Sequence, residues 1–243
     1  MGRAPRFSGK REVAIGLGIY ASYLLVRAVV VSEAGRRRAL RNAERIVTLE
    51  RRLGLHVEPE LQRLVLPYTR AVHVLNLGYG TLNFGLTIGY LMRLYFRRDP
   101  DFHRLRRAAA LAFAGAQPAF LWFPTAPPRS LDDMVDTIAE VSRFDLDSGP
   151  IAKLYHPLAA MPSVHVAFAV VTAAAIGETS GSSLARALAP GYPPLVALVV
   201  FVTANHYVLD AVAGAALGTA SLRIARRLEL WPCGLIQGGQ CSR

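Results

Sequence analysis

Two histidines stand in the most apolar part of this 243-residue sequence. His165 lies inside "AAMPSVHVAFAVV", and His206 lies in "VTANHYVLDAVAG", four residues before Asp210. A titratable side chain inside such a run is costly and is typical of a functional site. A carboxylate that holds one imidazole nitrogen fixes the tautomer and stabilises the charge that the ring gains when it attacks. On one helix face, the spacing of four would let Asp210 support His206 in this way.

Groups that suit a phosphate lie beside the same motifs. The segment "FPTAPPR" contains three prolines, which cannot continue a helix, and it places Arg129 at the end of a stiff, extended lead-in. Ser163 stands at the start of the helix that carries His165, where backbone N–H groups lack helical partners and attract anions. These residue types predict a phosphate-binding site that contains both histidines.

The chemistry that this set suits is phosphoryl transfer through a covalent phosphohistidine. His206 attacks as the nucleophile, and His165 protonates the leaving alkoxide and then deprotonates the acceptor. Arg129 and the N–H groups at the helix start neutralise the charge on the phosphoryl oxygens. The scheme requires no metal and no other cofactor. A His/His/Asp zinc site is the weaker alternative, because Arg129 would repel the ion.

Six apolar stretches must position these side chains, and several approach the about 20 residues that a helix needs to cross a bilayer. No linker or repeat divides the chain, so we predict an all-α, polytopic integral membrane protein of one domain, residues 1–243. The first stretch exceeds the apolar core of a signal peptide, and we expect it to be retained. The stretches cover roughly 13–31, 71–96, 108–124, 158–177, 192–209 and 211–222.

A bundle of six transmembrane helices brings the candidate residues together. The fourth helix starts at His165 and the fifth returns to His206, so both imidazoles lie on the same side of the membrane. Arg129 emerges on that side too, because the third helix ends where the fourth begins. Further polar residues in the second helix or next to the motifs are expected to line the headgroup or acceptor site, with interhelical packing as the alternative for the second helix. They are Asn76, Tyr79, Asn83, Asn205, Tyr207 and His156.

The net charge of +11 comes almost wholly from arginines next to the apolar stretches. This clustering favours membrane lipids with anionic headgroups as partners and argues against nucleic acid. Within residues 34–53, Leu40, Ala43, Ile46, Val47 and Leu53 recur at helical spacing opposite arginines and glutamates. We predict an interfacial amphipathic helix there, with a solvated helix packed on the bundle as the alternative. His56 and His103 are expected in solvated loops.

The motif "PSVH" followed by "HYVLD" resembles the type 2 phosphatidic acid phosphatase superfamily. Together with "FPTAPPR" and "NHYVLDAVAGA", it resembles most closely the branch of the inositol phosphorylceramide synthases, over about residues 70–220. The resemblance implies a six-helix bundle in the plasma membrane with an extracytoplasmic active site. By position it makes His206 the nucleophile, His165 the acid and base, Asp210 their support and Arg129 a phosphate ligand.

The sequence departs from the usual phosphatase pattern at two cationic positions. Trp122 replaces the lysine of the first motif, and Val199 and Val200 replace the Ser-Arg pair of the third. The candidates to supply the missing charge are Lys153, Arg143 and an arginine of the helix over residues 36–52. These losses favour a lipid phosphotransferase that moves a phosphoryl group or phospho-headgroup from a lipid to an alcohol. The alternatives are a phosphatase acting on phosphatidic acid or polyprenyl (pyro)phosphate and, less favoured by the intact histidine set, a non-enzymatic transporter or scaffold.

Overall fold

The computed structural model describes residues 7–143 and 155–234, and every named element in these ranges is helical. The all-α prediction is therefore confirmed. The longer helices are α1 (Gly9–Val30), α2 (Glu33–Leu53), α5 (Asn83–Phe96), α6 (Phe102–Trp122), α9 (Val164–Thr179), α11 (Tyr192–Val202) and α12 (Val208–Gly234). The shorter ones are α3 (Glu58–Val65), α4 (Thr69–Leu77), α7 (Thr137–Glu140), α10 (Ser183–Leu188), the π-helical turn η1 (Gly78–Leu82) and the 3-10 turns η2 (Pro128–Ser130) and η3 (Ala189–Gly191).

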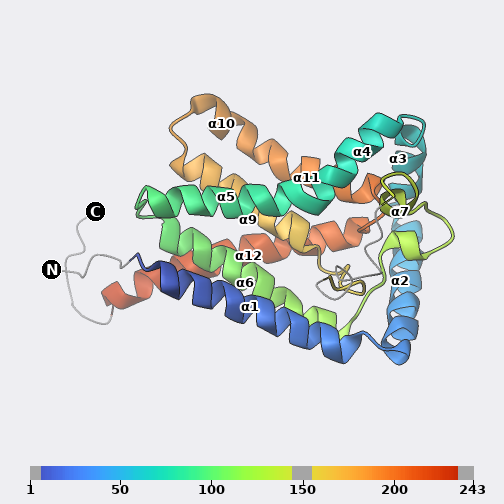
Figure 1. Ribbon diagram of the computed structural model, residues 1–243, viewed down its shortest axis with the longest axis horizontal. Coiled ribbons are helices and arrows are strands. Elements are labelled where there is room, and N and C mark those ends of the chain that lie inside the picture. The colour runs from blue at the N-terminus through green and yellow to red at the C-terminus, as the bar shows by residue number, and fades with distance from the viewer. Residues whose placement is uncertain (1–6, 144–154, 235–243) are drawn as a thin grey trace.

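The long helices form a bundle, and α2 crosses one end of it (Figure 1). α4, η1 and α5 follow one another without a break, as do α10, η3 and α11. The first turn of α1 and the last turn of α12 both lie at the end opposite α2 (Figure 1). Most of each predicted apolar stretch thus falls on a helix or on a chain of consecutive helices, but the stretch 192–209 also contains the turn between α11 and α12.

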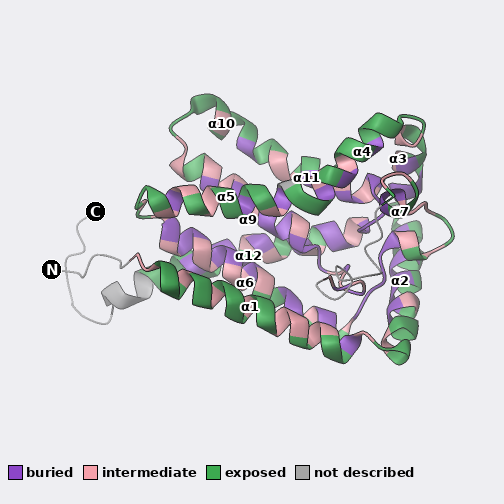
Figure 2. Ribbon diagram, viewed as in Figure 1, coloured by how far each residue is buried: buried purple, intermediate pink, exposed green. Residues whose placement is uncertain are grey.

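Three described helical segments are long and apolar enough to cross a membrane: Gly9–Val30, Ser183–Val202 and Val208–Glu229. The helix Val164–Thr179 is apolar but shorter. Figure 2 shows exposed residues along α1, α5 and α11, where large apolar side chains such as Leu17, Ile88 and Leu195 face outward. The chain is a membrane protein, with three segments that meet the length and composition of a crossing.

Close contact between α9 and α12 draws the two histidine motifs together. Gly214 and Gly218 form a GxxxG pattern on α12, a spacing that lets helix backbones approach each other in membranes. A Cβ atom on Gly214 would lie 2.2 Å from the carbonyl oxygen of Ser163, and one on Gly218 would lie 2.6 Å from that of Ala167. The Ser163 N–H also donates to the carbonyl of Asp210 at 3.0 Å. No larger residue fits at Gly214 without moving one helix.

The amphipathic helix predicted over residues 34–53 is observed as α2. Ala39, Ala43, Ile46 and Val47 are buried and form one cluster with Tyr207 and other residues of the bundle end. Leu53, which was assigned to the apolar face, is 56% exposed, because the helix ends there and the chain turns through Gly54. The apolar face of α2 therefore packs on protein, as in the packed-helix alternative.

Several local expectations are corrected by the structure. The break between the last two long helices falls at residues 203–207 and not after 209, so His206 lies in a turn and not on a helix. Neither loop histidine is solvated: His103 lies within α6 with its ring 4.8 Å from that of Phe7, and the His56 side chain is 15% exposed.

Candidate active site

The imidazoles of His165 and His206 meet directly. Nε2 of His206 lies 3.3 Å from Nδ1 of His165, and the ring centroids are 5.5 Å apart. His165 comes from the first turn of α9, and His206 comes from the turn that connects α11 to α12. The predicted convergence of the two motifs is thus present in the fold.

A backbone carbonyl determines the tautomer of His206. Nδ1 of His206 lies 2.8 Å from the carbonyl oxygen of Ala160, which can only accept a hydrogen bond, so Nδ1 carries the proton. In the neutral ring, Nε2 then holds the lone pair, and this atom faces Nδ1 of His165. Asp210 Oδ2 lies farther from Nδ1, at 3.4 Å, and accepts from the Tyr207 N–H. The carboxylate was expected to hold this N–H, but Ala160 is closer and Asp210 contributes its buried charge.

Aromatic side chains fix the ring of His165. Tyr79 stacks on it with a centroid distance of 4.5 Å, and Phe84 meets it edge-on at 4.8 Å. Tyr79 is carried by the π-helical turn η1, a feature that often marks functional positions in a helix. These two contacts hold the imidazole of His165 with its Nδ1 toward His206.

Arg129 reaches the same place from the proline-rich segment, and its side chain is 2% exposed. Nη1 donates to the side-chain oxygen of Asn205, Nη2 donates to the Tyr155 hydroxyl at 3.1 Å, and Nε lies 3.3 Å from Asp136. The extended lead-in is held by backbone hydrogen bonds of Thr125 with residues 158 and 160. The guanidinium is therefore fixed one residue away from His206, in contact with neighbouring Asn205.

A large apolar cavity of about 870 Å³ ends at the two histidines. Tyr79, Tyr155, His156 and Asn205 line it beside them, and the rest of its wall is mainly apolar side chains of α1, α5 and α6. Arg129 does not line the cavity and lies behind Asn205 and Tyr155. The far end is lined by Glu12 and Arg106, which form an ion pair at 3.0 Å. The cavity thus joins a polar end at the histidines to a long apolar interior.

His156 contributes a neutral ring to the polar end. Burial, and then the charge of Arg27, lower the pKa of His156 to about 4. Its Nδ1 accepts from the Leu158 N–H at 3.3 Å, while Nε2 is buried without a hydrogen-bond partner among the described residues. His156 is therefore uncharged at neutral pH and can offer a hydrogen bond to a bound headgroup.

Other predicted site residues are not brought to the cavity. Ser163 caps α9 by accepting from the Val166 N–H, and the Tyr207 hydroxyl donates to the carbonyl of Ala126. Asn76 joins α4 to α7 through Thr137, and Asn83 joins α5 to α9 and α11. The two asparagines match the interhelical alternative, and Lys153 lies outside the described residues.

Sequence reasoning missed several groups that shape this site. The Ala160 carbonyl and the Tyr155 hydroxyl carry no motif, because their positions depend on how residues 155–160 fold against Arg129 and His206. Glu50 Oε1 accepts from the Leu209 N–H and Glu58 Oε1 from the Val208 N–H, both at 2.7 Å. These buried carboxylates cap the helix that follows His206. The close contact between α9 and α12, in contrast, could have been predicted from the GxxxG spacing of Gly214 and Gly218.

Comparison with known proteins gives one match. A family model of the PAP2 superfamily matches residues 44–224, which include the second half of α2, both histidine motifs and Arg129. The chain therefore belongs to the PAP2 superfamily, and this membership indicates a phosphatase- or phosphotransferase-type activity on lipids. No curated protein and no solved structure matches the chain.

Proposed function

We propose that this protein is a membrane-embedded lipid phosphotransferase that works through a phosphohistidine on His206. The observation that carries the proposal is the histidine pair: Nε2 of His206, whose Nδ1–H is held by the Ala160 carbonyl, lies 3.3 Å from Nδ1 of His165 at the polar end of an apolar cavity. A nucleophile and a proton donor thus lie side by side where a lipid phosphate would stop.

The first half of the reaction forms the covalent intermediate. Nε2 of His206 attacks phosphorus, the bond from phosphorus to the lipid oxygen breaks, and that oxygen takes the proton from His165. The Nδ1–H of His206 stays on the Ala160 carbonyl, and Asp210 stabilises the positive charge that the ring gains. In the second half, His165 takes the proton of an acceptor hydroxyl, whose oxygen attacks phosphorus and breaks the P–N bond.

Arg129 balances the charge on the phosphoryl oxygens from behind Asn205 and Tyr155. A buried guanidinium with fixed partners needs little reorganisation when charge develops in the transition state. Asn205 and Tyr155 lie between Arg129 and the cavity, so they are the groups through which its charge reaches the phosphate. Lys153 is proposed as a further cation.

The shape of the cavity supports a lipid donor. Its walls beyond the histidines are formed largely by apolar side chains of three helices, which suit acyl or prenyl chains, and its volume falls in the range of small-molecule sites. A soluble phosphate ester would leave this apolar surface unused. We therefore propose that the donor's tail occupies the cavity and its phosphate reaches Nε2 of His206.

The choice of acceptor rests on the motif departures. The chain lacks two cations of the usual phosphatase motifs, a loss that the inositol phosphorylceramide synthase branch shares, and this favours an alcohol over water. Hydrolysis of phosphatidic acid or polyprenyl (pyro)phosphate is the second candidate, because the same phosphohistidine can react with water.

Six crossings of the plasma membrane are proposed, with the site on the extracytoplasmic side. The first turn of α1 and the last turn of α12 lie at one end of the bundle, which agrees with an even number of crossings (Figure 1). α2 crosses the other end and carries exposed arginines, including Arg36, Arg37 and Arg41, which suit lipid phosphates. This arrangement supports an interfacial position for α2 next to the site.

The nucleophile is tested with His206→Ala. Purified protein in detergent is incubated with a panel of lipid phosphates and phosphodiesters, with and without polyols and lipid alcohols, and the products are identified by mass spectrometry. We expect the variant to lose at least about 10⁴-fold in turnover. His73→Ala, at an exposed histidine, is the matched control and should keep full activity. Substantial turnover by a folded His206→Ala protein would refute the proposal.

The acceptor is tested in the same assay. Product that depends on an added alcohol, with little free phosphate, identifies a transferase. Free phosphate released from one lipid without any acceptor identifies the phosphatase alternative. Rapid quenching of the wild-type protein with a radiolabelled donor should trap acid-labile label on the chain, because a phosphoramidate P–N bond is formed.

A further inference from the structure

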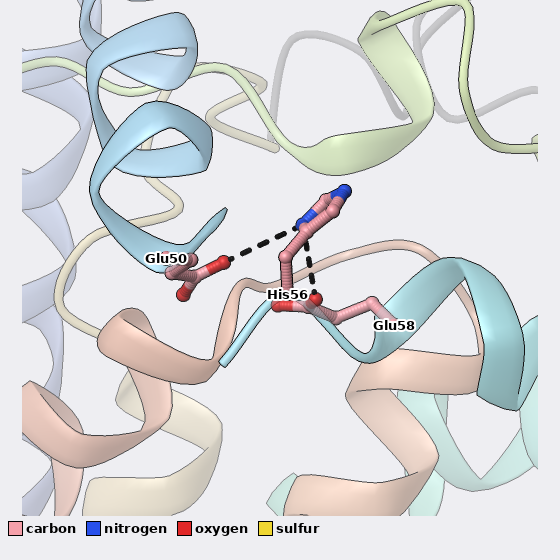
Figure 3. A group of neighbouring side chains, drawn as sticks. All are labelled: Glu50, His56 and Glu58. Atoms are coloured by element: carbon pink, nitrogen blue, oxygen red, sulfur yellow. Dashed lines mark ion pairs between the residues drawn. The ribbon is translucent and has the colours of Figure 1, made fainter. Parts of the chain in front are cut away.

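Three side chains outside the histidine pair converge at the end of the bundle that α2 covers. Nδ1 of His56 lies 3.4 Å from Oε2 of Glu58 and 3.8 Å from Oε2 of Glu50. Figure 3 shows the imidazole between the two carboxylates, which come from α2 and from the start of α3. All three atoms lie within 4.8 Å of one another.

The facing atoms of this cluster have no hydrogen-bond partner among the described residues. Oε2 of Glu50, Oε2 of Glu58 and Nδ1 of His56 are each buried and unpartnered, and both glutamates are 0% exposed. Their other oxygens are already used, since each Oε1 accepts a backbone N–H of α12. Three buried polar atoms without a hydrogen-bond partner therefore face one another, an arrangement that calls for a positive centre between them.

No lysine or arginine in the described part of the chain supplies that centre. Among the described residues, the only ion pairs of Glu50 and Glu58 are those with His56. Two buried carboxylates of the same sign are thus unfavourable by themselves, and a bound cation would remove the conflict.

We propose that Glu50, His56 and Glu58 bind a divalent metal ion, with Zn²⁺ as the best match. One imidazole nitrogen and two carboxylate oxygens are ligands that zinc takes, and a three-ligand set leaves a position for water. Ligand atoms about 2.0–2.1 Å from a tetrahedral zinc lie about 3.3 Å apart, so only small shifts close the observed spacing. Ligating carboxylates also need outer hydrogen bonds, and the α12 N–H groups provide them.

The local chain fixes this ligand set. Gly54 ends α2 with φ 68°, a conformation that glycine adopts easily, and the Leu55 N–H returns to the carbonyl of Glu50. The turn brings His56 back over the last turn of α2, and α3 begins with Glu58. The His56 side chain is 15% exposed and gives an ion a route from solvent.

The ion would act at a distance from the reaction. Glu50 and Glu58 hold Leu209 and Val208, the residues that directly follow His206 and Tyr207, so a metal on their outer oxygens would tie α2 and α3 to the start of α12. It would therefore position His206 without contacting substrate. The proposal is independent of the reaction assigned above, and its test reads metal binding and not turnover.

The test uses tag-free, full-length protein in detergent, stripped with a chelator and then dialysed. Titration with Zn²⁺, and in parallel with Mn²⁺ and Mg²⁺, is followed by calorimetry, metal analysis and the melting temperature, and Co²⁺ is added to record its ligand-field absorption. We expect one zinc per chain, a rise in melting temperature and a four-coordinate Co²⁺ spectrum. His56→Ala should weaken zinc binding at least about tenfold, because one of three ligands is lost.

His56→Ala removes a ligand without touching the hydrogen bonds to α12, so its folding is not endangered by a lost cap. Glu58→Gln is the second variant, and it should lose the zinc-dependent rise in melting temperature. His73→Ala also removes one histidine, but at an exposed position, and it should bind zinc like the wild type. Zinc binding that His56→Ala retains in full, or wild-type protein that binds no zinc, would overturn the proposal and leave the two carboxyl groups to share a proton.

Discussion

The two ends of the bundle each bury an arginine, and they treat its charge differently. At the end where the α5–α6 turn lies, Arg104 is 6% exposed and meets three carboxylates: Asp101 at 2.6 Å, Glu178 at 2.5 Å and Glu229 at 3.5 Å. At the end that α2 covers, Arg129 meets one carboxylate, and its other nitrogens donate to the neutral side chains of Asn205 and Tyr155.

This contrast indicates that Arg104 has a structural role and that Arg129 can interact with a ligand. Arg104 is surrounded by acidic groups, which leaves no net positive potential for a ligand and makes the cluster a clamp between α6, α9 and α12. Arg129 faces its one carboxylate through Nε, and its two terminal nitrogens, close to His206, have only neutral partners. A phosphate bound at the histidines would supply a further negative charge near Arg129. Arg104 already has three carboxylates and needs no ligand, so it is a structural ion pair and not a binding site.

The sharpest way to break this comparison is Arg129→Lys. A lysine keeps the charge but cannot serve Asn205, Tyr155 and Asp136 at once, because a planar fork is replaced by a point charge. We expect turnover to fall about 10²–10³-fold, the range for losing a preorganised donor to a developing oxyanion. Steady-state kinetics on the identified substrate give the value. Arg63→Lys, at an exposed position of α3, should leave the rate unchanged, and near-normal rates for Arg129→Lys would remove it from the phosphate site.

A smaller effect is expected from Gly214→Ala, which tests the contact that brings the two motifs together. The new methyl group would lie 2.2 Å from the Ser163 carbonyl oxygen, so α9 and α12 must separate. We expect a destabilisation of about 1–3 kcal/mol, as for overpacking in a core, and about a tenfold loss of turnover. Thermal unfolding in detergent and kinetics measure the two effects.

Gly89→Ala is the matched control for this change, since no atom lies within 4 Å of its added methyl group. An exposed helical alanine should be neutral or slightly stabilising there. Equal behaviour of the two variants would mean that the close approach of α9 and α12 does not set the histidine geometry.

The smallest effect on turnover is expected from Arg104→Gln at the opposite end. Removing this cation leaves three carboxylates near one another, so the free energy of unfolding should fall by about 2 kcal/mol. The rate per folded molecule should stay unchanged, because the cluster is separated from the histidines by the length of the bundle. Unfolding curves and the active fraction check this, and a large loss of rate in folded protein would contradict the distinction between the two ends.

The helical segments and their order followed from the sequence because apolar periodicity is a local property. The runs around residues 71–96 and 108–124 were placed on helices, and the proline-rich lead-in to Arg129 was recognised from ring constraints alone. Motif chemistry also selected His165, His206, Asp210 and Arg129, which the fold brings together. The residues expected to line the headgroup site were harder to predict. Asn76 and Asn83 form hydrogen bonds between helices, and in a sequence such residues look the same as polar residues of a binding site.

Local spacing misled where a turn interrupts a helix. The interval from His206 to Asp210 fits one helix face, but His206 lies in a turn and donates its main hydrogen bond to the carbonyl of Ala160, 46 residues earlier. Similarly, His56 in a short loop looks solvated until α2 and α3 fold back on the start of α12. Backbone partners carry no side-chain signature, so no pattern could have indicated them.

By itself, the sequence determined which residues are able to do chemistry and that helices in a membrane-like pattern carry them, since residue type and periodicity are written along the chain. Only the tertiary structure decided which nitrogen of His206 is free, which side chains reach the cavity and where two glutamates meet an imidazole. Those outcomes depend on distances between segments far apart in the chain, and such distances are set by close helix packing and not by neighbouring residues.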